Sequence, residues 1–248
     1  MFKKILTKLI NWYVAPLEWN YTSGLYAKGR IFHFKEEHIL SWVHFVRKNE
    51  KNISEKEILI DAGVFKGAVS AIFAKHFPKN PIVGFEPIPK HFENSVKNTA
   101  SLPNVKLLNM ALSDSSGEQT FHIATTASAS SLNPIVQNDR YTLAQEIQVK
   151  TVTLDDYFKE EDRILCLKMD IEGYELAVLK SGVKTLPRTR YVIAELNNQV
   201  EKENECQYYE VDEFLRQHGF KLIVIRAGYN YQGLGQYDAV YKNMNHKG

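Results

Sequence analysis

The amino-acid sequence predicts an α/β protein: a doubly wound, mostly parallel seven-stranded sheet with a terminal antiparallel hairpin, plus an N-terminal helical cap. From residue 57 onward, short apolar runs typical of buried strands alternate with amphipathic stretches of helical length. This alternation favours a parallel sheet with helices on both faces. The last two apolar runs are joined only by GYNYQGLGQ. Because that segment leaves no room for a crossover helix, the two runs must pair as an antiparallel hairpin.

The first part of the chain predicts helices rather than strands. In KEEHILSWVHFVRKN, residues 35–49, apolar residues recur at helical spacing and form one face. We therefore divide the chain into a helical cap segment, residues 1–50, and a main domain, residues 51–248. Residues 1–13 form a basic amphipathic stretch, which either packs on the domain or makes peripheral contact with an anionic membrane.

The main domain carries the predicted sheet. Its seven strands are expected at EILIDAG (57–63), PIVGFEP (81–87), NVKLLNMAL (104–112), RILCLKMD (163–170), RYVIAELN (190–197), FKLIVIRA (220–227) and QYDAVYKN (236–243). Helices are expected at KGAVSAIFAKHF (66–77), KHFENSVKNTAS (90–101), YELAVLKSGVKTL (174–186) and YYEVDEFLRQHG (208–219).

Residues 113–155 interrupt the alternation, and we interpret them as an insertion. GEQTFHIA (117–124) predicts an extra strand, and IQVKTVTLDDYF (147–158) predicts a strand that enters a short helix capped by Thr153. Between them, the small and hydroxyl-bearing residues of TTASASSLNP (125–134) suit a lid or a loop that contacts a sugar. A solvated connector is the alternative.

Composition excludes several classes of protein. The chain has 248 residues and a formal net charge of +2, so no global field favours nucleic acid as a partner. Its two cysteines, Cys166 and Cys206, have no metal-type spacing, and a reducing cytoplasm suits them. No apolar run approaches the length of a membrane span. We expect a cytoplasmic protein, with membrane association only through residues 1–13.

The first two strands of the main domain each end at an acidic residue. Asp61 leaves the first strand and is followed by Gly63 and Gly67, and Glu86 ends the second strand. Ligands of open α/β sheets bind outside these strand ends, where Glu86 could accept hydrogen bonds from a ribose diol. Asp61 would repel a pyrophosphate but suits a ligand with an amine and a sulfonium, which is S-adenosylmethionine. Alternatively, the glycines only form a turn and Asp61 caps a helix.

Five segments, in order along the chain, resemble the FkbM-type methyltransferases: LIDAGVFKGAVS, VGFEPIP, NMALSDSSGEQTFHI, VTLDDYF and LKMDIEGYELAVLKSG. The resemblance implies a Rossmann-like fold that uses S-adenosylmethionine to methylate hydroxyl oxygens, often on sugars or polyketides. It implies the following cofactor-binding residues: Asp61, Gly63, Gly67 and Glu86 in the cofactor motif, and Ser113 and Asp114 in the loop near the adenine. Phe65 departs from the pattern, because many members have Asn there.

Methylation of a hydroxyl needs a base that accepts its proton. Asp170 is the first candidate because it ends a central strand, and Glu172 and Glu195 follow as further catalytic candidates. Each has a structural alternative: Asp170 orients the methionine amine, Glu172 complements a helix dipole, and Glu195 pairs with an arginine. His122 is a rival base.

Three further interpretations concern the same edge of the sheet. Glu175 is expected to complement the helix dipole, and Lys168 to extend toward an acid. Several carboxylates together also suit a divalent cation, but no motif requires one, so we expect no metal ligands.

The sequence therefore predicts an S-adenosylmethionine-dependent O-methyltransferase with a small-molecule or glycan acceptor, most simply a sugar, and no nucleic-acid partner. Two alternatives stay open. One is a catalytically inactive protein of the same fold that serves as a binding module. The other is a nucleotide-sugar oxidoreductase, which the absence of G-x-G-x-x-G disfavours.

Overall fold

The computed structural model describes residues 34–126, 129–135, 142–197, 205–227 and 236–246. Two compact units divide the chain, Met1–Asn49 and Glu50–Gly248. In the first unit the described part is one helix, α3 (Phe34–Asn49), where the sequence predicts a helix. The remainder of the predicted cap, including the basic amphipathic stretch of residues 1–13, lies outside the described residues. Within the described ranges, no helix is both long and apolar enough to cross a bilayer.

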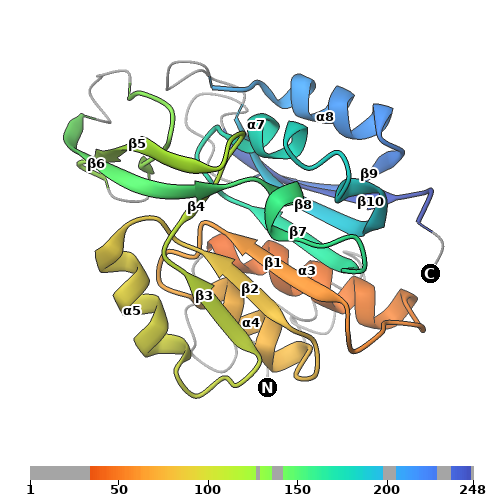
Figure 1. The fold of residues 1–248 in the computed structure, drawn as a ribbon. Coiled ribbons are helices and arrows are strands. Elements are labelled where there is room, and N and C mark those ends of the chain that lie inside the picture. Colours follow the sequence, from red (N-terminus) through yellow and green to blue (C-terminus); the bar gives the residue numbers. More distant parts are fainter. Residues whose placement is uncertain (1–33, 127–128, 136–141, 198–204, 228–235, 247–248) are drawn as a thin grey trace, which may run out of the picture. The chain divides into compact units, whose positions relative to one another are not determined.

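The second unit is built on a seven-stranded sheet with the order β3–β2–β1–β7–β8–β10–β9 (Figure 1). Its strands are β1 (Ile58–Ala62), β2 (Ile82–Phe85), β3 (Val105–Leu108), β7 (Ile164–Met169), β8 (Thr189–Asn197), β9 (Phe220–Ala227) and β10 (Gln236–Asn243). The pairs from β3 to β8 are parallel, and β10 is antiparallel to both of its neighbours. This confirms the predicted α/β class with a mostly parallel seven-stranded sheet and an antiparallel hairpin.

The hairpin adds one feature that the sequence did not predict. Its second strand, β10, lies inside the sheet between β8 and β9, while β9 forms the edge. The burial of the two strands differs accordingly. Ala239, Val240 and Tyr241 of β10 are at most 3% exposed, whereas Ile225 of the edge strand β9 is 58% exposed.

Helices cover both faces of the sheet, as expected for a doubly wound fold. They are α4 (Ala68–His76), α5 (Pro89–Thr99), α7 (Glu175–Lys180) and α8 (Tyr208–Gln217). Successive strand residues point to opposite faces. Ser70 of α4 bonds to Asp61, whereas Ile60 belongs to the core with Val178 of α7 and Leu215 of α8. The helices α4 and α7 therefore pack on opposite faces of β1.

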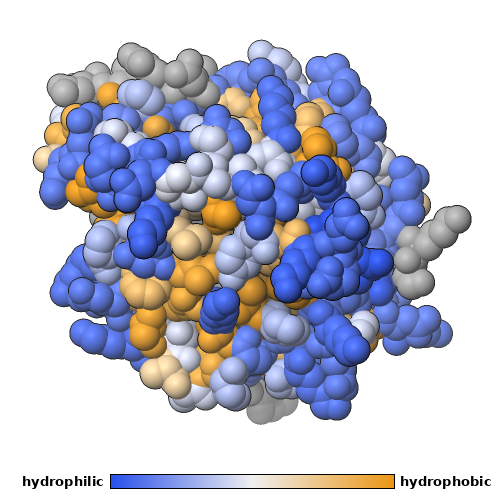
Figure 2. Space-filling view, viewed as in Figure 1, coloured by the Kyte–Doolittle hydropathy of each residue, from blue (hydrophilic) through white to orange (hydrophobic). Residues whose placement is uncertain are grey.

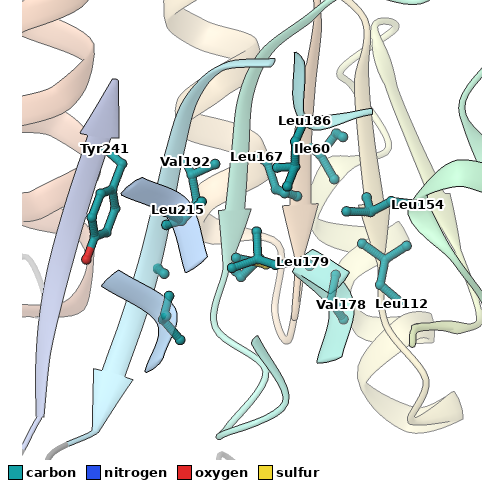
Figure 3. Packing of buried hydrophobic residues seen from close by; sticks show 14 of the residues in the cluster. Ile60, Leu112, Leu154, Leu167, Val178, Leu179, Leu186, Val192, Leu215 and Tyr241 are labelled. Carbon is teal, nitrogen blue, oxygen red and sulfur yellow. The ribbon is translucent and has the colours of Figure 1, made fainter. Parts of the chain in front are cut away.

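The core on the face of α7 and α8 is a layer of aliphatic side chains from strands and helices. Figure 3 shows Leu167 and Val192 from neighbouring strands, with Leu179 and Leu215 from the covering helices, in one cluster. On the surface, hydrophobic residues gather over β2 and β3, and polar residues dominate the helical flanks (Figure 2).

The predicted insertion supplies two strands of a second, three-stranded sheet with the order β4–β6–β5, and β4 directly precedes the insertion. These strands are β4 (Ala111–Leu112), β5 (Gly117–Ala124) and β6 (Leu143–Val152). The strand predicted at 117–124 is confirmed. After β6 comes the short helix α6 (Leu154–Tyr157), and the Thr153 hydroxyl accepts a hydrogen bond of 3.0 Å from the Asp156 amide, which confirms the predicted cap.

The strand predicted at 104–112 is wrong in its extent. Val105–Leu108 belongs to the seven-stranded sheet, and Ala111–Leu112 belongs to the second sheet. Asn109 marks the break, because its side-chain amide donates to the carbonyls of Glu86, at 2.9 Å, and Pro87, at 3.0 Å. These contacts tie the end of β3 to the end of β2, and the chain leaves the sheet there.

Candidate active site

The turn after β1 brings the first two strands into contact with the end of β7. Gly63 has φ +82°, and a Cβ atom built on it would lie 2.0 Å from the carbonyl oxygen of Asp170. Only glycine allows this approach and this conformation together. The Gly63 amide donates to the carbonyl of Phe85, at 3.1 Å. Gly67 also has a positive φ and forms the N-cap of α4. Backbone geometry therefore requires the glycines of the predicted cofactor motif.

Asp61 lies within β1 and is fully buried. The Ser70 hydroxyl donates to Asp61 Oδ2 at 2.6 Å, and Lys168 Nζ lies 3.6 Å from Asp61 Oδ1, just beyond hydrogen-bond distance. Burial raises the pKa of Asp61, and the charge of Lys168 opposes that rise. Asp61 Oδ1 makes no hydrogen bond within the described part of the chain. A buried oxygen of this kind is poised to accept one from a ligand.

Lys168 connects the two acidic ends of neighbouring strands. Its side chain is 3% exposed and its Nζ lies 3.5 Å from Asp170 Oδ2, in addition to the contact with Asp61. The sequence predicted that Lys168 extends toward an acid, and in the structure it lies close to two, Asp61 and Asp170. The shared ammonium offsets part of the repulsion between them.

Glu86 follows β2 and is 4% exposed. Its Oε2 accepts a hydrogen bond of 2.7 Å from the Phe65 amide, and its Oε1 accepts one of 3.0 Å from the Ile88 amide. Burial raises the pKa of Glu86 to about 7, against the opposing effect of these two bonds. An ionised carboxylate offers about four acceptor positions. The two backbone bonds therefore fix the carboxylate and leave it able to accept further bonds from a diol.

The backbone of Phe65 is in an unfavourable conformation. Its φ is +52°, a left-handed conformation in which asparagine is several-fold enriched and bulky residues are outliers. The conformation aims the Phe65 amide at Glu86. The ring packs edge-on against His91, with centroids 4.7 Å apart. Here the aromatic contact, rather than an amide side chain, accompanies the strained backbone.

Ser113 and Asp114 lie at the start of the insertion. The Ser113 hydroxyl donates to Asp114 Oδ1 at 3.1 Å. Burial alone would raise the pKa of Asp114, but hydrogen bonds from Gln119 and neighbouring hydroxyl groups outweigh it and lower the pKa. Tyr174 also bonds to both residues. The two predicted adenine-loop residues therefore adjoin the loop that follows β7.

The three predicted catalytic acids come together. Asp170 follows β7, Glu172 lies two residues later, and Glu195 belongs to β8. One carboxylate oxygen from each lies within 4.8 Å of the others, and we call these three residues the acid group. Asp170 is anchored by its amide, which donates to the carbonyl of Ala62 at 3.1 Å. A set of three oxygens at this spacing could bind a polar acceptor or a divalent cation.

The other titratable candidates lie elsewhere or hold the backbone. His122 in β5 contacts Glu146, with Nδ1 3.1 Å from Oε1, and is not part of the acid group. Glu175 is 2% exposed, and its Oε1 accepts a hydrogen bond of 3.1 Å from the Ile171 amide. Burial raises the pKa of Glu175 to about 7. The geometry thus gives Glu175 a local structural contact, and its expected role toward the helix dipole stays a prediction.

The sequence did not predict the contacts that two residues of the insertion make with the loop after β7. Ser131 and Asn133, from the segment interpreted as a lid or sugar loop, donate to the carbonyls of Glu172 and Gly173. The sequence offered one weak signal, an asparagine followed by Pro134, which marks a turn but not its partner.

A parallel sheet with this strand order and one reversed strand near its edge is the fold of Rossmann-like methyltransferases. A crystal structure of Streptococcus pneumoniae Sp1610 with bound S-adenosylmethionine shares the fold. It superposes with a TM-score of 0.51 at 13% identity, over 88% of this chain and 75% of that chain.

A sequence model of the methyltransferase FkbM domain matches residues 61–222, more than half of the chain. The chain therefore belongs to the FkbM methyltransferase family.

Two curated relatives are similar to this chain over part of its length. The 2-O-methyltransferase NoeI of Sinorhizobium fredii is 27% identical, over 57% of this chain and 64% of its own. The hexuronic acid methyltransferase AglP of Haloferax volcanii is 28% identical, over 58% of this chain and 57% of its own. The chain thus spans about three fifths of each relative.

Proposed function

We propose that this protein transfers a methyl group from S-adenosylmethionine to a hydroxyl oxygen, on a sugar or glycan precursor. The observation that carries the proposal is the contact between the turn after β1 and the acid group. At Gly63 the turn touches the backbone of Asp170, so a ligand bound at the turn lies beside the first candidate base. Membership of a methyltransferase family supports the same conclusion, as do its relatives NoeI, named a 2-O-methyltransferase, and AglP, named a hexuronic acid methyltransferase.

The residues of the turn fit S-adenosylmethionine. Glu86 is fixed by two backbone amides and would accept hydrogen bonds from the ribose hydroxyls. Asp61 has a buried oxygen without a hydrogen bond among the described residues, and it shares the Lys168 ammonium with Asp170, so it keeps the capacity to accept a hydrogen bond from the ligand. Gly63 lets the turn approach Asp170 closely. Ser113 and Asp114 would border the adenine.

The reaction follows from the positions of these groups. Bound S-adenosylmethionine supplies a methyl group on a positively charged sulfur. The chain would hold the acceptor hydroxyl for attack on this methyl group, and such positioning accounts for much of the rate enhancement in displacements of this kind. Asp170 would accept the hydroxyl proton as the oxygen is methylated, while the sulfur would leave with the electron pair of the broken bond. Glu172 and Glu195 orient the acceptor through its other hydroxyl groups.

Three measurements test the proposal in two steps. Mass spectrometry of the purified protein and calorimetry with S-adenosylmethionine test the cofactor. Transfer of radiolabelled methyl groups to a panel of neutral hexosides, deoxyhexosides, amino sugars and hexuronic acids then tests the acceptor class, with Asp170→Asn as the inactive control. We expect cofactor binding in both proteins and transfer to at least one sugar by the wild type alone.

Each alternative function has its own outcome in this experiment. Cofactor binding without transfer to any acceptor would favour the binding module. Binding of a nicotinamide dinucleotide in place of S-adenosylmethionine would favour the oxidoreductase.

A further inference from the structure

The loop between β7 and α7 is held by residues from outside the seven-stranded sheet. The Ser131 hydroxyl donates to the carbonyl of Glu172 at 2.9 Å. The Asn133 side-chain amide donates to the carbonyl of Gly173 at 3.0 Å. Both side chains are buried, at 0% and 3% exposure. Two consecutive carbonyls of the loop that carries Glu172 are therefore fixed by the segment that follows β5.

That segment is itself anchored to the second sheet. Ser131 pairs with His122 of β5 through two backbone hydrogen bonds, of 2.8 Å and 3.0 Å. The Ser131 hydroxyl also accepts a hydrogen bond of 3.1 Å from the backbone amide of Asn133. The Ser131 hydroxyl therefore accepts a hydrogen bond from the Asn133 backbone amide and donates one to the Glu172 carbonyl. The segment that holds the loop is therefore hydrogen-bonded to β5 of the insertion.

The loop needs such an attachment because its conformation is unfavourable. Glu172 has φ +58°, a conformation that is strained for a residue other than glycine and that persists only where surrounding contacts enforce it. The same conformation accompanies the close approach of three carboxylates within 4.8 Å, which repel one another when ionised. Free of its attachment, the loop would relax and carry Glu172 away from Asp170 and Glu195.

We propose that Ser131 and Asn133 are positioning residues that hold Glu172 in the acid group for the reaction with the acceptor. This inference rests on the proposed function. It assigns the insertion a part in the reaction, through contacts with the loop backbone rather than with the sugar. Residues 125–134, interpreted from the sequence as a lid or a sugar loop, would thus affect the sugar only through Glu172.

The test compares single and double variants. Asn133→Ala and Ser131→Ala are made in the wild type and in a Glu172→Gln background. The control, Asn243→Ala, removes an equally buried side-chain amide that donates to two backbone carbonyls, those of Leu186 and Thr189. Turnover is measured on the sugar that the wild type methylates fastest, together with the affinity for S-adenosylhomocysteine.

We expect Ser131→Ala and Asn133→Ala each to lower kcat by about tenfold to a hundredfold when Glu172 is present. This is the range for a group that is displaced by about 1 Å in the active site. In the Glu172→Gln background the same substitution should change kcat less than threefold, because its effect passes through Glu172. Product affinity should stay within a few-fold, and Asn243→Ala should retain kcat. Equal losses of kcat in both backgrounds, or no loss in either, would overturn the inference.

A second measurement keeps this test separate from the proposed function. Amide hydrogen exchange is followed at Ile171 and Cys206, whose amides donate to Glu175 Oε1 and to the Gly173 carbonyl. Asn133→Ala should accelerate exchange at both amides, and Asn243→Ala should not. If the wild type methylates no sugar, the proposed function fails. Unchanged exchange in Asn133→Ala would then show that Asn133 does not hold the loop, and faster exchange would show that it does.

Discussion

Two sets of acidic residues lie at the same edge of the sheet, and they are held in different ways. Asp61 and Glu86 are at most 4% exposed, and Glu86 has a backbone amide on each oxygen. The acid group is more open: the Asp170 side chain is 23% exposed, and Glu172 depends on a strained backbone. The first set is formed by strand ends and one turn. The second needs two strands, a loop and the insertion together.

Under the proposed function, this difference would separate cofactor binding from the reaction. A buried carboxylate fixed by backbone amides keeps one orientation and suits a ligand that is always the same. A partly exposed carboxylate at a junction of several segments can exchange protons with an acceptor. Substitutions at the two sets should therefore affect different measured quantities.

The largest effect is expected for Asp170→Asn. The substitution keeps the shape of the side chain and removes the base, and loss of a general base typically lowers a rate by about a hundredfold to ten-thousandfold. Turnover should fall by that range while the affinity for S-adenosylmethionine stays within a few-fold. A parallel loss of affinity would instead assign Asp170 to the methionine amine. Retention of most activity would move the search to Glu172, then Glu195, then His122.

The contact that joins the two sets can be broken at Gly63. Gly63→Ala would place a Cβ atom 2.0 Å from the Asp170 carbonyl at φ +82°, so the turn must move. We expect the free energy of unfolding to fall by about 2–4 kcal/mol, measured by urea titration. Gly117→Ala is the matched control, because its φ is also positive but no atom lies within 4 Å of the added Cβ. Equal destabilisation in both variants would contradict the steric argument.

Substitution of the buried set should weaken binding. Asp61→Asn removes a charge, and Glu86→Ala removes a carboxylate that would bind the ribose. Hydrogen bonds to charged groups contribute about 1.5–3 kcal/mol, so each variant should bind S-adenosylmethionine more than tenfold more weakly in calorimetry. Wild-type affinity in both variants would exclude this cofactor site.

The pH dependence of binding sharpens the comparison further. Because the pKa of Glu86 is about 7, raised by burial from 4.5, much of Glu86 is protonated at pH 6. The ionised form is the better acceptor for a ribose diol, so affinity should fall by up to about tenfold between pH 8 and pH 6. Glu86→Gln should remove this dependence, and Glu175→Gln should leave it. A dependence that survives in Glu86→Gln would assign it to another group.

The same shift has the opposite sign for folding without ligand. A raised pKa means that the folded state binds the proton more tightly than the unfolded state. The contribution of Glu86 to stability is therefore complete below about pH 4.5 and is lost as the pH rises through about 7. Cofactor binding and folding thus respond in opposite directions over this range.

The smallest effect is expected for metal removal. The acid group has the oxygen donors that a divalent cation prefers, but proton transfer by Asp170 needs none. Activity should be unchanged after treatment with a chelator. Loss of activity that added Mg²⁺ restores would redefine Asp170, Glu172 and Glu195 as ligands.

The sequence predicted the parts of this molecule that depend on local pattern. Strand runs, the Thr153 cap and the glycines of the first turn are encoded in short segments. The gathering of Asp170 with Glu195 followed from the rule that parallel strands end at one edge. The roles of Ser131 and Asn133 could not be predicted, because their partners lie about forty residues away and the contacts are made to backbone. Any residue could have supplied the carbonyls, so the sequence carries no sign of the pairing.

The inner position of β10 has a consequence for the order of folding. This strand comes latest in the sequence among the described strands, yet it lies between β8 and β9. Until it docks, β8 has an unpaired edge, and Glu195 lacks its neighbour across the strands, Asp238. Such long-range pairing slows folding, and an open edge invites association with other chains. During synthesis, one edge of β8 therefore stays unpaired until nearly all of this sequence has emerged.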